Sequence, residues 1–157
     1  MRFGSTLRGG PGVGEEARES ELAGFDLVGS ADTQSLLPDV YCSLTQVALR
    51  TERVTVAPWV TNVSTRLPVV TAGAIATIDQ VSGGRALLAI GTGRSSTANA
   101  GLRAATPDEL AKAITTIASA FRPNTGARED IEWPRGLQVD ERVVALPGWA
   151  TRRVPIY

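Results

Sequence analysis

The chain contains no histidine in 157 residues and only one cysteine, Cys42. Without histidine, Ser-His-Asp and Cys-His nucleophilic machinery are excluded, and one cysteine is too few for the usual zinc ligand sets. We therefore expect no metal site, and we expect any enzymatic chemistry to depend on a bound cofactor. A single cysteine also excludes an intrachain disulfide. Its position in an apolar helical pattern predicts that Cys42 is a buried, unreactive side chain.

Excess charge and long apolar runs are also absent. The 16 Lys and Arg residues balance the 16 Asp and Glu residues, so a basic surface for nucleic acid is not supported. No run of about 18 apolar residues exists, so no membrane span is expected. Residues 1–7 are too short an apolar stretch for a signal peptide. An apolar content of 43% suits a soluble globular domain, for which we expect a cytoplasmic location.

Short apolar runs alternate with helix-forming segments along the first 121 residues. The patterns predict strands at 2–6, 25–30, 54–57 and 86–90, and helices at 15–23, 39–50, 68–80 and 107–121. Alternation of this kind indicates an α/β fold with a parallel sheet and helical crossovers. Pattern alone leaves two architectures open: an open doubly wound sheet, or part of a (β/α)8 barrel, which needs about 250 residues.

The chain changes character after residue 121. Residues 122–153 contain three prolines, three glycines and scattered charges, which predict an irregular region with at most a small hairpin at 139–146. Residues 154–157 again have the composition of a strand. We therefore divide the chain into an α/β part at 1–121, an irregular insertion at 122–153 and the beginning of a fifth strand at 154–157.

The loop after the strand at 86–90 is the best candidate for binding an anionic group. Gly91, Thr92, Gly93 and Arg94 provide unobstructed backbone N–H groups, a hydroxyl and a guanidinium, which are the groups that hold phosphate. The spacing matches neither G-x-G-x-x-G nor the Walker A pattern, so a dinucleotide or NTPase site gains little support. A plain turn from strand to helix requires glycine as well, and both interpretations stay open.

The segment after the strand at 54–57 is a candidate for one wall of a ligand pocket. There Trp59 and Val60 are followed by the polar residues Thr61 and Asn62. A large aromatic residue beside polar groups at a strand end suits a flat ligand. Packing of a bulky residue on the rim of the sheet explains the same pattern equally well.

Two charged residues complete the candidate set. Asp32 follows the strand at 25–30, where a carboxylate can exchange a proton with a substrate, although the pattern alone favours a helix cap. Arg66 lies near the same end of the sheet and either binds an anion or pairs with a surface acid. Gly83 and Gly84, by contrast, lie in a turn between helix and strand and predict positive φ angles rather than chemistry.

Five motifs follow one another in a recognisable order: DTQ at 32–34, TERVTV at 51–56, VTN at 60–62, TRLP at 65–68 and SGGRALLAIGTGRS at 82–95. In this combination the chain resembles the luciferase-like monooxygenase superfamily, and most closely its F420-dependent branch, which includes methylenetetrahydromethanopterin reductases. The resemblance implies a partial (β/α)8 TIM barrel, with strands one to four and the start of strand five. It also implies a flavin or deazaflavin at the carboxyl ends of the strands.

The resemblance assigns roles to the candidate residues. It implies a non-proline cis peptide bond around Trp59–Val60 beneath the ring system, and it places Asp32 at an acidic, catalytic position near the ring. The cofactor-binding residues that it implies are Trp59, Val60, Thr61, Asn62, Gly91, Thr92, Gly93 and Arg94. The chain departs from several F420-dependent relatives, which have a histidine near the ring, and it has Leu67 where relatives often have histidine.

The implied reaction is hydride transfer between F420 and a small organic substrate, and the alternative is an FMN-dependent monooxygenase of the same superfamily. A further alternative is a non-catalytic fragment that binds flavin weakly, because the expected half barrel ends at Tyr157. Half a barrel has two open sheet edges and uncovered apolar helix faces, which favour association into a homo-oligomer. Neither nucleic acid nor a membrane is an expected partner.

Overall fold

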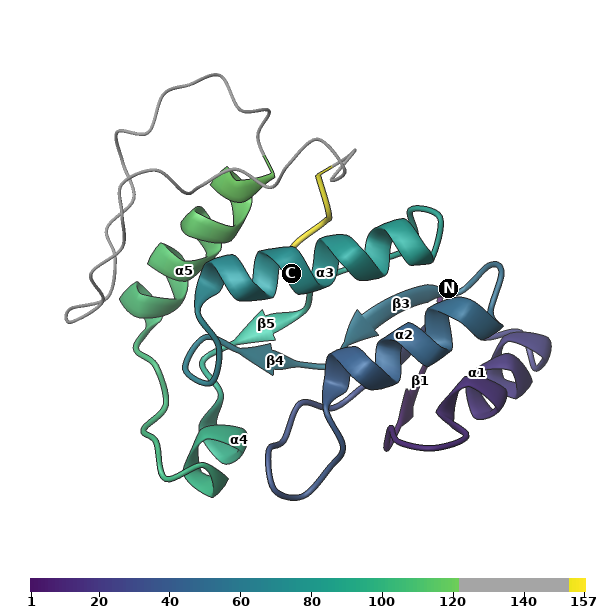
Figure 1. Cartoon of the computed structure of the whole chain (residues 1–157), viewed down its shortest axis with the longest axis horizontal. Coiled ribbons are helices and arrows are strands. Elements are labelled where there is room, and N and C mark those ends of the chain that lie inside the picture. Colours follow the sequence, from purple (N-terminus) through teal and green to yellow (C-terminus); the bar gives the residue numbers. More distant parts are fainter. Residues whose placement is uncertain (122–152) are drawn as a thin grey trace.

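A parallel sheet forms the centre of the computed structural model, which describes residues 1–121 and 153–157 (Figure 1). Strands β1 (Gly4–Leu7), β2 (Leu27–Ser30) and β3 (Thr55–Pro58) pair in parallel in the order β1-β2-β3. The predicted hairpin at 139–146, and nearly all of the predicted insertion at 122–153, lie outside the described residues. The parallel strands with intervening helices confirm the predicted α/β class.

The sheet continues beyond β3 through shorter pairings. Val56 bridges to Ala86 and Leu88 bridges to Ile156, both in parallel, while β4 (Thr61–Asn62) pairs in parallel with β5 (Ile90–Gly91). The expected strand at 86–90 is therefore a bridged segment in which only Ile90 and Gly91 belong to a continuous strand. Residues 154–157 lie beside it, as the sequence predicts, because the Tyr157 N–H donates to the Leu88 carbonyl at 2.8 Å.

Side-chain caps mark the starts of two of the helices in the described part of the chain. The helices are α1 (Val13–Leu22), α2 (Val40–Arg50), α3 (Pro68–Val81), α4 (Arg94–Asn99) and α5 (Pro107–Ala120). Helix α2 begins at Asp39, whose carboxylate accepts the N–H groups of Tyr41 and Cys42. Helix α5 begins with a capping box formed by Thr106 and Glu109, an arrangement that satisfies two otherwise unpaired N–H groups.

The core lies between the sheet and the layer of helices α1, α2, α3 and α5, each packed against the next along the chain. Its largest fully buried side chains come from these four helices and from the strands and bridged segments that they cover: Val13, Val28, Val40, Leu44, Val47, Val54, Val56, Ile75, Ile78, Leu88, Ile117 and Val154. Burial of one such side chain stabilises the fold by about 1.5–3 kcal/mol. The short strands are thus held mainly by the helices that cover them.

The expected burial of Cys42 is wrong. Cys42 is exposed, because it lies in the first turn of α2 on the side opposite the face that buries Val40, Leu44 and Val47. The glycines at 91 and 93 lie in a turn from strand to helix, one of the two interpretations left open by the sequence. The short helix α4 that follows was not predicted; Gly93 adopts φ 77° before it and the Thr97 hydroxyl donates to the Gly93 carbonyl. The glycines of the 82–85 turn do have positive φ, at 67° for Gly83 and 89° for Gly84.

Two charged groups, the partly buried Arg85 and the buried Glu21, hold the amino ends of the strands. The Arg85 guanidinium donates to the carbonyls of Ala48, Thr51 and Val54, at 2.7–3.1 Å, and burial lowers its pKa. These carbonyls belong to the end of α2 and the entry to β3. Arg85 therefore connects the turn before the 86–91 segment to the end of α2 and the entry to β3.

The Glu21 carboxylate connects the end of α1 to the segment that leads into β3. It accepts the N–H groups of Glu52, Arg53 and Val54 at 2.6–3.1 Å. Burial opposes its charge, but these three donors outweigh burial and lower the pKa of Glu21. Hydrogen bonds to a charged group contribute more than neutral ones, about 1.5–3 kcal/mol.

Within residues 1–121 and 153–157, no helix is both long enough and apolar enough to cross a membrane.

We expect Glu21→Gln to lower the free energy of unfolding by about 2 kcal/mol, because a neutral amide cannot accept three N–H groups as well as a carboxylate. A lowered folded pKa stabilises the fold above the ordinary value of 4.5, and the contribution disappears as the pH falls through the folded value. Urea denaturation between pH 3 and 7 should therefore show a flatter pH dependence for the variant. The control is Glu15→Gln, whose exposed ion pair with Arg50 should change stability by less than about 1 kcal/mol. Equal stability of Glu21→Gln and the unmodified chain at pH 7 would contradict this assignment.

Candidate functional site

The carboxyl ends of β2 and β3 bring the candidate residues together. The two strands pair with Gly29 opposite Ala57 and Ser30 opposite Pro58, so the segments that follow leave the same edge of the sheet. The Trp59 N–H donates to the Ser30 carbonyl at 2.7 Å and continues this pairing by one residue. A side chain on Gly29 would meet the Trp59 Cβ at 2.7 Å, so the glycine provides the space in which Trp59 lies.

The Trp59–Val60 peptide bond is cis, at the position that the family resemblance implies. Both side chains are half exposed, at 46% for Trp59 and 49% for Val60. Two neighbouring large apolar residues at the carboxyl end of a strand form a surface suited to a flat apolar ligand. The sequence predicts such a surface there, and the structure leaves it accessible.

Asp32 lies behind this surface and is only 2% exposed. Its Oδ2 accepts the Thr61 hydroxyl at 2.6 Å and an Arg66 guanidinium nitrogen at 2.7 Å, while its Oδ1 accepts the Gln34 amide nitrogen. The helix-cap interpretation is therefore wrong for Asp32, since Asp39 caps the next helix. A buried carboxylate requires such donors, because removing an ion from water costs several kcal/mol.

Arg66 connects Asp32 to the start of α2. One guanidinium nitrogen lies 2.7 Å from Asp32 and the other lies 2.7 Å from Asp39, so Arg66 pairs with acids rather than standing free for an anion. Burial works against the charge of Arg66, but the Asp32 and Asp39 carboxylates outweigh it and raise the pKa of Arg66. Burial likewise opposes the charge of Asp39, while the Cys42 N–H and Arg66 lower the pKa of its carboxyl.

Tyr41 completes the cluster from the first turn of α2. The Arg66 guanidinium lies 5.0 Å from the centroid of its ring, within the range of a cation–π contact. The phenol lies near Thr61 and Thr71, and burial raises the pKa of Tyr41 to about 12. Its hydroxyl has no hydrogen bond of normal geometry to the described residues. Tyr41 is therefore neutral across the physiological pH range.

Asn62 organises the turn that carries Arg66. Its side-chain oxygen accepts the N–H groups of Ser64 and Thr65, both at 3.0 Å, and its amide nitrogen donates to the Ser96 hydroxyl of α4 at 3.3 Å. Asn62 is 1% exposed, as is Thr61. Both residues therefore support the site from within, whereas Trp59 and Val60 face outward.

The 91–94 loop lies beside this turn, because β5 pairs with β4. A side chain at Gly93 would overlap the Asn62 side chain and come within 2.9 Å of Thr97 Cγ2, so the glycine allows α4 to pack onto the turn. A side chain at Gly91, in contrast, would meet nothing within 4 Å. Gly91 and Thr92 are partly accessible and Arg94 is exposed at the start of α4.

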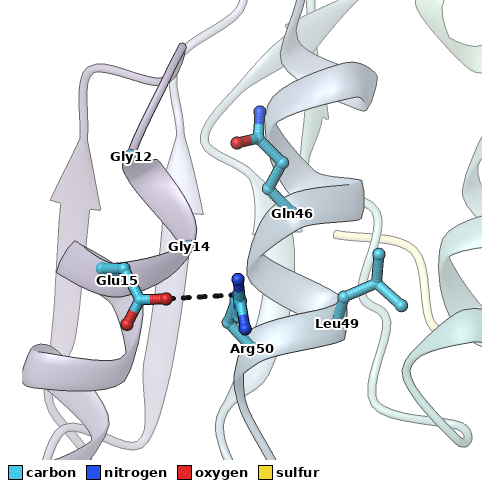
Figure 2. Close-up of a pocket in the computed structure, with 6 residues that line it drawn as sticks. All are labelled: Gly12, Gly14, Glu15, Gln46, Leu49 and Arg50. Atoms are coloured by element: carbon cyan, nitrogen blue, oxygen red, sulfur yellow. Dashed lines mark ion pairs between the residues drawn. The ribbon is translucent and has the colours of Figure 1, made fainter.

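A surface hollow of about 470 Å³ lies elsewhere, between α1 and α2 (Figure 2). The Glu15–Arg50 ion pair spans it at 3.2 Å, and the exposed Leu49 lies at its rim. None of the residues lining this hollow belongs to the candidate site. We therefore place the functional site at the strand ends on the basis of its buried polar groups rather than the size of a hollow.

Sequence reasoning missed Tyr41, Asp39 and Gln34 as members of the cluster. The DTQ motif at 32–34 was visible, but only the structure shows that the Gln34 amide turns back onto Asp32. Asp39 carries an ordinary cap signal that gives no indication of its second role as a partner of Arg66. Tyr41 stands in the same turn, where its spacing relative to Arg66 depends on tertiary packing.

Comparison with known proteins places this geometry in context. The family model described as luciferase-like monooxygenase matches residues 8–157. The 5,10-methylenetetrahydromethanopterin reductase of Methanolobus tindarius is 36% identical over 88 residues, which are 56% of this chain and 27% of that protein. The enzyme of the same name from Archaeoglobus fulgidus is 43% identical over 74 residues, 47% of this chain and 22% of that protein. The match thus spans about a quarter of the length of these relatives.

Several solved structures are also similar to this chain. The coenzyme F420-dependent tetrahydromethanopterin reductase of Methanopyrus kandleri superposes with a TM-score of 0.64 at 27% identity, covering 76% of this chain and 38% of that one. An F420-dependent secondary alcohol dehydrogenase in complex with an F420–acetone adduct has a TM-score of 0.76 at 18% identity, covering 100% and 52%. The oxygenating constituent of 3,6-diketocamphane monooxygenase from Pseudomonas putida, in complex with FMN, superposes with a TM-score of 0.65 at 19% identity. That superposition covers 77% of this chain and 39% of the other. The last two likenesses concern the fold alone.

We expect Arg66→Gln to lower the free energy of unfolding by about 3 kcal/mol, because it leaves the Asp32 carboxylate buried without its positive partner. Arg103→Gln is the matched control, since Arg103 also pairs with a carboxylate but is 70% exposed. That variant should lose far less stability than Arg66→Gln, because an exposed ion pair is screened by water. Chemical denaturation of the two variants measures the difference, and similar losses in both would contradict a structural role for the Asp32–Arg66 pair.

Two glycine substitutions should behave differently. Gly93→Ala should destabilise the chain by at least about 1 kcal/mol, because alanine is disfavoured at φ 77° and its Cβ would overlap Asn62. Gly91→Ala has open space and no positive φ, so its melting temperature should equal or exceed that of the unmodified chain. Thermal unfolding by circular dichroism distinguishes them, and equal losses in both variants would exclude the packing of Gly93 on Asn62.

Proposed function

The chain belongs to the luciferase-like monooxygenase family, and we propose that it forms the Asp32 side of an F420 site for hydride transfer to or from a small organic substrate. The proposal rests on one observation above all. A buried carboxylate held by Thr61 and Arg66 lies next to the accessible Trp59–Val60 segment, at the edge where ligands of parallel α/β proteins bind.

The residues at this edge fit a flat, partly apolar ring. Trp59 and Val60 present an exposed apolar surface. The vacant position beside the Cα of Gly91 allows a ring or chain to approach the backbone closely. Thr92 and Arg94 add a hydroxyl and a guanidinium for the anionic part of such a ligand. The ring would not meet every residue of the site directly. The turn after β4 and the start of α4 are held in place from the buried side by Thr61, Asn62 and Gly93.

F420, when bound, supplies the carbon that gains or loses the hydride. The chain's own contribution is orientation: Trp59 and Val60 support the ring, and Asp32 accepts a hydrogen bond that fixes a donor group of the substrate or cofactor. Thr61 and Arg66 keep the Asp32 carboxylate in place by occupying its Oδ2. Its catalytic effect thus comes from a prearranged acceptor rather than from a mobile side chain.

F420 is the first choice of cofactor because the solved structure of an F420-dependent reductase reaches 27% identity with this chain, against 19% for the structure in complex with FMN. FMN is the second candidate, since a structure of the same fold was solved in complex with FMN. An FMN-dependent monooxygenase would use the same surface beside Trp59.

The proposal extends to architecture and assembly. We propose that the described sheet is part of a (β/α)8 barrel, with residues 1–121 as its first half and 154–157 as the beginning of the next strand.

Among the described strands, β1 pairs on one side only. An unpaired edge favours association, so a self-associating, non-catalytic flavin binder is the second candidate function. Size-exclusion chromatography together with a turnover assay separates it from a monomeric enzyme.

We expect titration with F420 to quench the tryptophan fluorescence of the chain, because Trp59 would lie against the ring. Trp59→Phe should lose most of this quenching, although Trp133 and Trp149 remain in the sequence. Gly91→Ala should weaken binding at least five-fold without a loss of stability, since its methyl group would occupy the space proposed for the ligand. Quenching by FMN and not by F420 would select the alternative cofactor. Absence of quenching by both would refute the proposed site.

A further inference from the structure

The two oxygens of the Asp32 carboxylate have different surroundings. Oδ2 accepts two hydrogen bonds, from Thr61 at 2.6 Å and from Arg66 at 2.7 Å. Oδ1 accepts one, from the amide nitrogen of Gln34. A carboxylate has about four acceptor positions, so Oδ2 is filled while Oδ1 retains capacity.

The three donors are also anchored differently. Thr61 belongs to β4 and is buried, and Arg66 is held a second time by Asp39. Gln34 belongs to the loop between β2 and α2, and it is followed by Ser35, which has a positive φ of 67°. Thr61 and Arg66 are therefore fixed by the fold, whereas Gln34 is held on Asp32 through its own side chain.

The other end of the Gln34 amide is unsatisfied. Its Oε1 is buried and accepts no hydrogen bond from the described residues. A buried acceptor without a partner loses its hydration and gains nothing in return. In this position the Gln34 amide nitrogen has a hydrogen-bond partner, Asp32, while the Gln34 amide oxygen has none among the described residues. Rotation of the Gln34 side chain outward would return that oxygen to water.

We propose that Gln34 is a displaceable cap on Asp32, whose amide nitrogen occupies the place that a ligand N–H or O–H takes on Oδ1. This inference rests on the proposed function, since it requires a ligand at the strand ends. It identifies Oδ1 as the ligand-contacting atom and Gln34 as a specificity-determining residue. The site then selects a hydrogen-bond donor, because an acceptor group cannot replace the amide nitrogen on a carboxylate oxygen. Because Asp32 is only 2% exposed and the Gln34 amide nitrogen lies on Oδ1, we expect a ligand to reach Oδ1 by displacing this amide, although Oδ1 has a second acceptor position.

Removal of the cap should expose Asp32 whether or not a ligand binds. Carbodiimide-activated coupling of glycine ethyl ester, followed by peptide mapping, measures the accessibility of this carboxylate. We expect Gln34→Ala to raise the labelling rate of Asp32 at least ten-fold. Gln46→Ala is the matched control, since Gln46 donates only to the Gly10 carbonyl at 3.4 Å and should leave the rate unchanged. An unchanged rate in Gln34→Ala would overturn the cap.

Binding tests the role of the cap in recognition. Whichever of F420 and FMN quenches the unmodified chain should bind Gln34→Ala several-fold more tightly, because no amide competes for Oδ1. In an Asp32→Asn background the same substitution should have no effect, since the asparagine oxygen stays with the donors Thr61 and Arg66 and its amide nitrogen, a donor, takes the place of Oδ1. Gln34→Asn, whose amide is one methylene shorter, should also tighten binding and covers the case in which the alanine variant does not fold. Equal or weaker binding by the folded Gln34 variants would overturn the inference.

The labelling and binding outcomes separate the two proposals. If neither cofactor quenches the unmodified chain, the proposed function fails, while the labelling rates still decide whether Gln34 covers Asp32. If a cofactor binds and the Gln34 variants label at the rate of the unmodified chain, the cap fails and the cofactor site stands.

Discussion

The buried charge of Asp32 is the constraint on which the carboxyl edge of the sheet depends. An ion removed from water must be compensated by donors of good geometry, and here the donors come from three different segments. Thr61 is supplied by β4, Arg66 by the turn that Asn62 organises, and Gln34 by the loop before α2. Each segment is thereby held at a defined distance from the others. Arg66 extends the connection to the Asp39 cap, so the start of α2 is positioned by the same charge.

Close packing supports this electrostatic arrangement at two glycines. Gly29 leaves room for Trp59 above β2, and Gly93 leaves room for α4 against Asn62. At both positions even the Cβ atom of an alanine would come too close to the neighbouring side chain. The accessible surface formed by Trp59 and Val60 is therefore backed by a rigid frame rather than by a loop alone. Such preorganisation matters for a site whose effect comes from fixed orientation.

Local signals in the sequence predicted the elements well because they depend on nearby residues. The apolar spacing of residues 40–48 gave α2, and the Pro and acidic residues at 107–109 gave the start of α5. The site was only partly predictable. Asp32 was identified, but its competing interpretation as a cap could be rejected only once Asp39 was seen in that place. Helix α4 was missed because its start depends on the positive φ of Gly93. The exposure of Cys42 follows from helical spacing, because residue 42 lies opposite the apolar stripe of Val40, Leu44, Val47 and Ala48; membership of an apolar segment alone was not sufficient evidence for burial.

The two ends of the sheet use charge in different ways. At the amino ends, Glu21 and Arg85 bind mostly backbone N–H and carbonyl groups, which every sequence provides. At the carboxyl ends, Asp32 and Arg66 bind other side chains, which single substitutions can remove or replace. A substitution at the carboxyl edge can therefore change the groups that a neighbouring molecule would meet there, while the backbone contacts at the amino edge continue to hold the strands in place.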